Sequence, residues 1–77
     1  LVTGAASGIG AAVARLAAAA GATLALTDRD GARLRALAEE IGAAAALEAD
    51  LSRPEAPAEV ARGAVARCGR IDGLVNA

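Results

Sequence analysis

The first ten residues, LVTGAASGIG, decide the fold of this chain. The apolar pair Leu1-Val2 predicts a short strand, residues 3–10 (TGAASGIG) predict a glycine turn, and the alanine-rich run that follows predicts a helix. The first N–H groups of such a helix have no partner within it, and the helix dipole adds positive potential at the same end. Because glycines keep Cβ atoms out of the way, the turn favours an anionic ligand such as a pyrophosphate. The stretch therefore predicts a dinucleotide site.

The glycine spacing leaves a second interpretation open. Gly4, Gly8 and Gly10 follow the pattern G-x-x-x-G-x-G rather than G-x-G-x-x-G, the best-known dinucleotide fingerprint. In the alternative, Gly4 serves a tight turn, while Gly8 and Gly10 only let the helix pack closely on a strand. The rest of the chain decides between the two interpretations.

Length and composition limit the chain to one small domain. A chain of 77 residues buries only about 60% of the surface that its unfolded form exposes. Hydrophobic residues make up 56% of it and are mostly alanine, with no aromatic residue and no methionine, so the core is thin. The chain begins with leucine, and its first strand is shorter than usual. We therefore expect residues 1–77 to be a partial dinucleotide-binding domain, truncated at both ends.

Charge and cysteine content exclude several classes of function. Eight arginines are spread among nine acidic residues, for a net charge of −1, so no basic stripe is available for a nucleic acid. No apolar run reaches the roughly 18 to 20 residues that span a bilayer, and the start lacks the charged region of a signal peptide. A single cysteine, Cys68, cannot form an internal disulfide and suits a reducing compartment. We expect a cytoplasmic protein with no nucleic-acid partner, no membrane partner and no metal site.

Strand and helix signals alternate along the chain. Strands are predicted near residues 1–3, 22–27, 43–49 and 71–75, with three helices between them. This alternation is typical of a parallel sheet with helices on both faces. We therefore predict an α/β fold, a partial Rossmann-like doubly wound sheet of four strands and three helices in the strand order 3-2-1-4.

Capping signals predict where the helices begin and end. The first helix is expected to end at Gly21, and the second to run from an Asp30 cap to Gly42. The third is expected to begin at the capping box Ser52-Arg53-Pro54-Glu55 and to end at Gly69. Apolar residues at helical spacing predict the buried faces: Ile9, Val13, Leu16 and Ala20 in the first helix, Leu34, Leu37, Ala38 and Ile41 in the second, and Val60, Ala64, Val65 and Cys68 in the third.

Polar residues follow three of the predicted strands. Asp28 ends the second strand, eighteen residues after Gly10, close to the offset of about 20 residues expected for a carboxylate that binds an adenosine ribose. Asp50 follows the third strand and is placed to accept a hydrogen bond from an adenine amino group, and Asn76 follows the fourth. Both aspartates are also common turn residues, and that simpler interpretation stays open.

Three ordered motifs together resemble the N-terminal half of the classical short-chain dehydrogenase/reductase family. Residues 3–10 are similar to its T-G-x-x-x-G-I-G cofactor loop, and Asp50-Leu51 to its D-[VL] adenine pair. Residues 71–77 (IDGLVNA) are similar to the start of its I-D-x-L-V-N-N-A-G strand. The resemblance extends over the whole chain and is far more specific than the glycines alone.

The resemblance implies a role for each matched residue. The implied contacts are the pyrophosphate and neighbouring ribose for Gly4, Ser7 and Ile9, the adenosine ribose for Asp28, the adenine for Asp50 and Leu51, and the cofactor ribose region for Asn76. The predicted cofactor-binding residues are Thr3, Gly4, Ser7, Gly8, Ile9, Gly10, Asp28, Arg29, Asp50, Leu51, Asn76 and Ala77.

The same resemblance favours NAD as the cofactor. Family members that use NADP often carry a basic residue just before the second glycine, where this chain has Ser7, and Asp28 would repel a 2′-phosphate. NADP stays as the less favoured alternative, because the Arg29 guanidinium can turn toward a phosphate. One departure is that the family commonly has a second Asn where this chain has Ala77.

The family's catalytic residues are not found in this chain. In the family a Tyr, its pKa lowered by a nearby Lys, moves a proton while the nicotinamide moves a hydride. This sequence has no tyrosine and no lysine, so we predict no catalytic residue within it. The resemblance implies a homo-oligomeric parent oxidoreductase that acts on a small alcohol or carbonyl substrate. A non-catalytic dinucleotide sensor or scaffold, or an inactive truncated fragment, remains an alternative.

Overall fold

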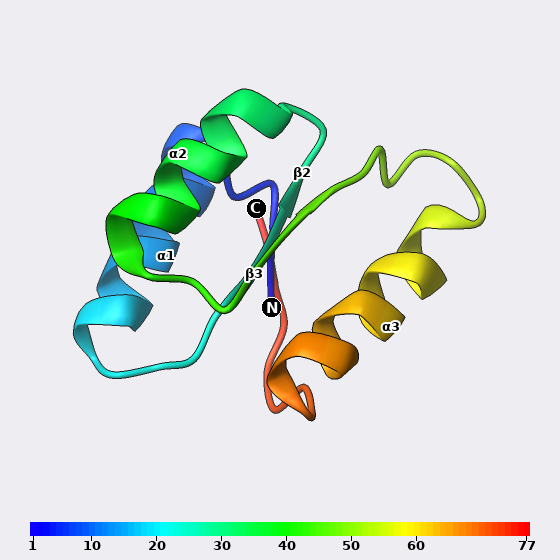
Figure 1. Ribbon diagram of the computed structural model, residues 1–77. Helices are drawn as coiled ribbons and strands as arrows, with labels where there is room; N and C mark the ends of the chain where they lie inside the picture. Colours follow the sequence, from blue (N-terminus) through cyan, green and yellow to red (C-terminus); the bar gives the residue numbers. More distant parts are fainter.

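The computed structural model describes residues 1–77 as four strands and three helices that alternate along the chain (Figure 1). The elements are β1 (Val2–Thr3), α1 (Gly8–Ala19), β2 (Ala25–Asp28), α2 (Gly31–Ile41), β3 (Ala45–Glu48), α3 (Ala56–Cys68) and β4 (Val75–Asn76). None of these helices combines the length and apolar character that crossing a bilayer requires.

The four strands form one parallel sheet in the order β3-β2-β1-β4. Helices α1 and α2 lie side by side on one face, and α3 covers the other (Figure 1). This arrangement confirms the predicted doubly wound fold and its strand order. Because all strands run in the same direction, their carboxyl ends meet at one edge of the sheet.

Two apolar clusters hold the helices against the sheet. The larger lies under α1 and α2 and includes Leu26, Leu34 and Leu37. Each such leucine contributes about 1.5–3 kcal/mol through burial. The smaller cluster, beneath α3, consists of Ala25, Ala45 and Ala64, with the half-buried Cys68 packed beside them. The predicted role of Cys68 as a small packed hydrophobe agrees with this position.

Helix α1 turns a different face to the core from the one predicted. Its buried residues are Gly10 and Ala14, whereas Ile9 and Leu16 are 74% and 73% exposed. The predicted stripe was therefore wrong for Ile9, Leu16 and the exposed Ala20. The physical reason is distance, since Gly10 packs directly on the backbone of the glycine turn and leaves no room for a large side chain on that face.

The ends of α1 and α2 agree with their capping signals. At α2 the Asp30 carboxylate accepts a hydrogen bond from Arg33 N (3.2 Å), and Gly42 closes the helix in the left-handed conformation (φ 68°). At α1 the chain leaves the helix through Gly21 (φ 91°). The Ser7 side chain caps the start of α1, a role that the sequence interpretation did not assign.

The predicted capping box at residues 52–55 does not form. Helix α3 begins at Ala56, its cap residue Glu55 makes no side-chain cap, and Ser52 donates to Asp50 instead. Glu55 pairs with Arg53 (3.1 Å), so neither polar partner of the box is free. This stretch forms two successive turns, closed by hydrogen bonds from Arg53 N to Asp50 O and from Ala56 N to Arg53 O. The helix therefore begins only after them.

Strands β2 and β4 are also shorter than predicted. Strand β2 begins at Ala25 rather than Ala22, and β4 is confined to Val75–Asn76 rather than residues 71–75. Both segments enter the sheet from loops, and only their ends pair with β1. The predicted buried face of α3 was wrong for Val65, which is 44% exposed, because the close contact with the sheet is made by Val60 and Ala64.

Candidate functional site

The carboxyl edge of the sheet brings together residues from all four strands. A cavity of about 280 Å³ opens there. Its walls are Thr3, Gly4, Asp28, Arg29, Ala49, Asp50, Leu51, Ser52 and Ala77. Seven of these nine are residues that the sequence predicted to bind a cofactor, and they come from four separate stretches of the chain. We call this cavity the strand-end cavity.

At two positions of the glycine turn, Gly4 and Gly10, the packing of the fold itself requires a glycine. Gly4 adopts φ 62°, and a Cβ there would lie 2.5 Å from the carbonyl oxygen of Ala77. A Cβ on Gly10 would overlap the Gly4 carbonyl and lie 2.8 Å from its carbon. A side chain at either position therefore displaces backbone, so the packing of the fold by itself accounts for both glycines.

Gly8 is different, because nothing in the protein lies within 4 Å of where its Cβ would be. The fold itself does not require a glycine there. The N–H groups of Gly8 and Ile9 are also without a hydrogen-bond partner, since Ser7 Oγ takes only the N–H of Gly10 (3.1 Å). The first turn of α1 thus presents two free donors beside an open space, the arrangement that binds an anion.

Ser7 holds the glycine turn closed. Its hydroxyl donates to the Gly4 carbonyl (2.6 Å), and its backbone N–H donates to the same oxygen (3.0 Å). Ser7 Oγ also accepts from Gly10 N, so this exposed serine makes hydrogen bonds to both ends of the turn. Ser7 and Gly8 also border a second cavity, of about 310 Å³, which lies between α1 and α2 and includes Arg33.

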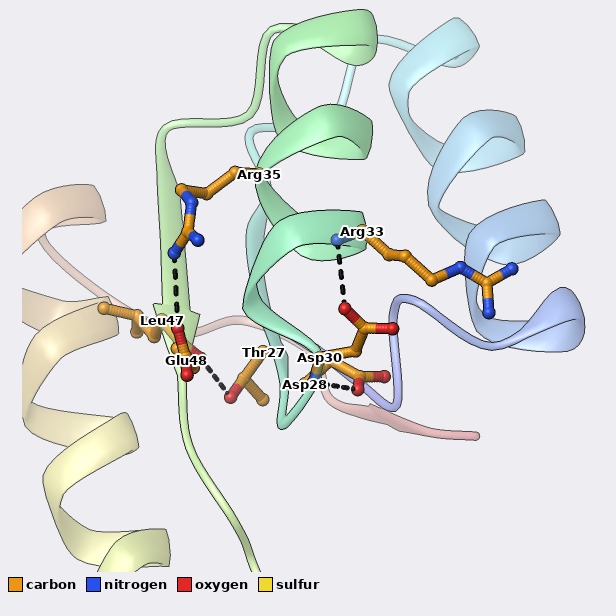
Figure 2. A network of polar contacts seen from close by, with 7 residues as sticks. All are labelled: Thr27, Asp28, Asp30, Arg33, Arg35, Leu47 and Glu48. Atoms are coloured by element: carbon orange, nitrogen blue, oxygen red, sulfur yellow. Dashed lines mark hydrogen bonds and ion pairs between the residues drawn. The ribbon is translucent and has the colours of Figure 1, made fainter.

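Asp28 connects the glycine turn to the turn after β2. Its Oδ2 accepts from Ala6 N (2.9 Å), and its Oδ1 accepts from Asp30 N (2.9 Å). Figure 2 shows the second of these bonds beside the Asp30 cap of α2. Each carboxylate oxygen keeps a further lone pair for a ligand. The half-buried Asp28 therefore has a structural task, and it also forms part of the cavity wall.

The neighbouring strand end is fixed by a buried hydroxyl. Thr27 is fully buried, and its Oγ1 donates to the carbonyl of Leu47 (2.5 Å), which ties β2 to β3 (Figure 2). Next to it an exposed ion pair joins Arg35 on α2 to Glu48 on β3 (3.2 Å; Figure 2). These contacts set the position at which the chain leaves β3 for the cavity.

Asp50 is held by one residue on its own loop. Its Oδ1 accepts from both the hydroxyl (2.6 Å) and the N–H (3.0 Å) of Ser52. These hydrogen bonds lower the pKa of the Asp50 carboxyl, with smaller contributions from the charges of Arg29 and Arg53. The group is therefore an ionised acceptor at neutral pH.

Asn76 lies where β4 ends and contacts Thr3. The Thr3 hydroxyl donates to Asn76 Oδ1 (2.8 Å), and the N–H of Ala77 donates to the Thr3 carbonyl (3.3 Å). The amide nitrogen of Asn76 is left free to donate elsewhere. Five residues of the predicted set do not line the strand-end cavity: Ser7, Gly8, Ile9, Gly10 and Asn76. The Ile9 side chain is exposed to solvent.

The sequence interpretation missed Ala6, Ala49 and Ser52. Ala6 contributes only a backbone N–H to Asp28, which no side-chain pattern reveals. A serine two residues after an aspartate is a known turn signal, and it was assigned to a helix cap instead. No group of three or more His, Cys, Asp or Glu side chains is arranged to hold a metal ion.

A larger cavity, of about 480 Å³, lies at the opposite edge of the sheet. Its walls are mostly apolar and include Val2, Leu24 and Cys68. It lies away from the free N–H groups of α1 and from the carboxylates at the strand ends. Its two charged side chains, Arg70 and Asp72, form an ion pair with each other (3.1 Å).

Comparison with known proteins gives consistent matches. The family model described as short chain dehydrogenase matches residues 1–77. L-fucose dehydrogenase of Oryctolagus cuniculus is 40% identical over 76 residues, which cover 99% of this chain and 27% of that protein. Inactive 2-(S)-hydroxypropyl-CoM dehydrogenase 2 of Xanthobacter autotrophicus is 48% identical over 65 residues, covering 83% of this chain and 28% of that protein.

A solved structure matches the fold as well as the sequence. It is a metagenomic short-chain oxidoreductase in complex with NADP, with a TM-score of 0.82 and 46% identity over 95% of this chain. The match covers 35% of that chain, so the present chain spans about a third, or less, of the length of these relatives. With the strand order, the glycine turn and the strand-end residues in place, the chain belongs to the short-chain dehydrogenase family.

Proposed function

We propose that residues 1–77 form the N-terminal part of the cofactor-binding domain of a nicotinamide-dependent oxidoreductase that interconverts an alcohol and a carbonyl by hydride transfer. The observation that carries the proposal is the convergence at one edge of the sheet. The glycine turn connects the two features, because Thr3 and Gly4 line the strand-end cavity and Gly8 and Ile9 present two free N–H groups at the start of α1. The matching relative from Oryctolagus cuniculus is named as L-fucose dehydrogenase, which supports the activity.

The proposed roles follow from the chemistry of each group. Gly8 and Ile9 donate backbone hydrogen bonds to the pyrophosphate. Asp28 accepts from the hydroxyls of the adenosine ribose, and Asp50 accepts from the adenine amino group with Leu51 beside the ring. Asn76 donates toward the ribose on the nicotinamide side. The cofactor supplies the hydride, and the protein supplies binding and orientation.

We further propose that NAD binds more tightly than NADP. The Asp28 carboxylate forms part of the wall that an adenosine ribose would contact, and a 2′-phosphate there meets a charge of the same sign. The related structure with NADP and the presence of Arg29 in the same wall support the opposite preference. Asp28 outweighs Arg29 in our proposal, because its carboxylate is fixed by two backbone donors.

Fluorescence titration of the full-length protein with NADH and NADPH tests the proposal. We expect NADH to bind at least about tenfold more tightly, a difference of about 1.4 kcal/mol. Tighter binding of NADPH would overturn the NAD preference while leaving the dinucleotide site intact. Absence of binding for both would overturn the site itself.

A second candidate is a dinucleotide sensor or scaffold without catalysis. The observation that favours it is the relative from Xanthobacter autotrophicus, which is named as inactive. Turnover of a panel of secondary alcohols with NAD by the full-length protein separates the two functions, because a sensor binds the dinucleotide without reducing it.

Location and assembly are part of the same proposal. We propose a cytoplasmic enzyme, supported by the free Cys68, and a homo-oligomer, as the family resemblance implies. Fractionation of the source cells and light scattering of the purified protein test these two points.

A further inference from the structure

The carboxylate of Asp50 lies on an exposed loop, between the end of β3 and the start of α3. An exposed side chain that is free to rotate loses conformational entropy when a ligand orders it, and this loss weakens binding. An Asp50 that recognises a ligand therefore benefits from being ordered beforehand. In the structure, hydrogen bonds from Ser52 order the Asp50 carboxylate in this way.

Ser52 makes two hydrogen bonds to one oxygen of Asp50. The hydroxyl donates to Oδ1 at 2.6 Å and the backbone N–H donates to the same Oδ1 at 3.0 Å. The backbone of the loop is closed at the same place, because Arg53 N donates to the Asp50 carbonyl (3.1 Å). Two donors on one oxygen fix both the position and the rotation of the carboxylate.

The second oxygen, Oδ2, has no hydrogen bond to the protein. Ser52 and Asp50 are both in the wall of the strand-end cavity, as are Leu51 and Ala49. The arrangement leaves one unoccupied, ionised acceptor beside two apolar side chains. Such a combination fits the edge of a purine that carries an amino group, with the ring against the apolar side chains.

We propose that Ser52 is a positioning residue, which orients the Asp50 carboxylate so that Oδ2 accepts a hydrogen bond from the 6-amino group of the cofactor's adenine. This inference rests on the proposed function. It concerns a residue whose sequence signal pointed to a helix cap, and the cap is not formed.

The charged surroundings of Asp50 support the geometry. Arg29 approaches from the turn after β2, Arg53 lies on the same loop and is paired with Glu55, and Asp28 is the other carboxylate of the cavity wall. The hydrogen bonds from Ser52 are the largest cause of the lowered pKa of Asp50. Loss of the hydroxyl therefore raises that pKa, and a cofactor contact made by the ionised form is then lost at a higher pH.

The experiment compares NADH with deamino-NADH, in which the 6-amino group is replaced by an oxygen. Binding of each is titrated to the full-length wild type and to Ser52→Ala and Ser52→Thr. We expect Ser52→Ala to weaken NADH binding about fivefold and deamino-NADH binding by less than about twofold, since the variant removes one charge-assisted hydrogen bond that orders the acceptor. Ser52→Thr, which keeps the hydroxyl, should bind NADH as the wild type does.

A pH profile gives an independent readout. The loss of NADH binding on the acid side should move to higher pH in Ser52→Ala and stay in place in Ser52→Thr. Equal weakening of both dinucleotides by Ser52→Ala, or a Ser52→Thr variant as weak as Ser52→Ala, would overturn the positioning role. A wild type that binds NADH and deamino-NADH equally would overturn the adenine contact, and a wild type that binds neither would overturn the proposed function as well.

Discussion

The glycines of the turn allow the demands of the fold to be separated from those of the ligand. A Cβ added at Gly10 would overlap the Gly4 carbonyl oxygen and lie 2.8 Å from the Gly4 carbon and 3.0 Å from the Ala5 Cα. All three are backbone atoms and cannot rotate away. We expect Gly10→Ala to lose about 1–3 kcal/mol through overpacking, partly offset by the gain of about 0.5–1 kcal/mol for Ala over Gly in a helix.

Gly8→Ala is the matched variant two residues away. Its Cβ meets no protein atom within 4 Å, and its backbone does not require positive φ. We expect the free energy of unfolding of Gly8→Ala to equal that of the wild type or to exceed it by up to about 1 kcal/mol. The same Cβ stands beside the free N–H groups, so we expect NADH affinity to fall at least about tenfold.

Urea unfolding and NADH titration of both full-length variants test this pair. We expect opposite profiles: Gly10→Ala loses stability, and Gly8→Ala loses NADH affinity at unchanged stability. A Gly10→Ala protein as stable as the wild type would refute the packing argument. A Gly8→Ala protein with full NADH affinity would refute the placement of the pyrophosphate at this turn.

Three further predictions concern the core, the cofactor preference and the surface. Leu26→Ala, at a fully buried position, should cost about 2–5 kcal/mol in urea unfolding, and a loss well below 1 kcal/mol would contradict the core described here. Asp28→Asn removes the negative charge and should shift the NADH to NADPH affinity ratio about tenfold toward NADPH, whereas an unchanged ratio would show that Asp28 does not discriminate. Arg15 bonds Glu40 at 2.6 Å and 3.1 Å, and the Arg15 hydrogen bond lowers the pKa of that carboxyl. At pH values above the ordinary pKa of a glutamate, Arg15→Gln should therefore have a slightly lower melting temperature than the wild type. This difference should disappear as the pH falls through the lowered pKa of Glu40, or as salt is added. A difference that persists in acid would contradict the prediction.

The order of elements was predictable because each depends on a local signal. Asp30, Gly42 and Gly21 act at the residues where the sequence places them. The alanine run at β3 forms a strand although alanine favours helix, since pairing with β2 outweighs the intrinsic preference. The positions of Asp28 and Asp50 at neighbouring strand ends follow from the parallel order alone.

The sequence predictions fail where contacts between segments, rather than the periodicity of the sequence, determine which residues are buried or capped. Ile9 and Leu16 have helical spacing and are exposed, because α1 approaches the glycine turn at a distance that only Gly10 and small alanines permit. Ser52 and Glu55 have the spacing of a capping box, but Asp50 and Arg53 compete for them at shorter range. The bond from Ala6 N to Asp28 is a tertiary contact of the backbone, which the residue types do not encode.

A crystal structure of the full-length protein with bound NADH would show directly whether the dinucleotide lies at the carboxyl edge of the sheet. We expect the pyrophosphate on the N–H groups of Gly8 and Ile9, ribose hydroxyls within hydrogen-bond distance of Asp28, and the adenine amino group on Asp50. A dinucleotide bound away from the carboxyl edge of the sheet, or one whose adenosine end avoids both aspartates, would contradict it.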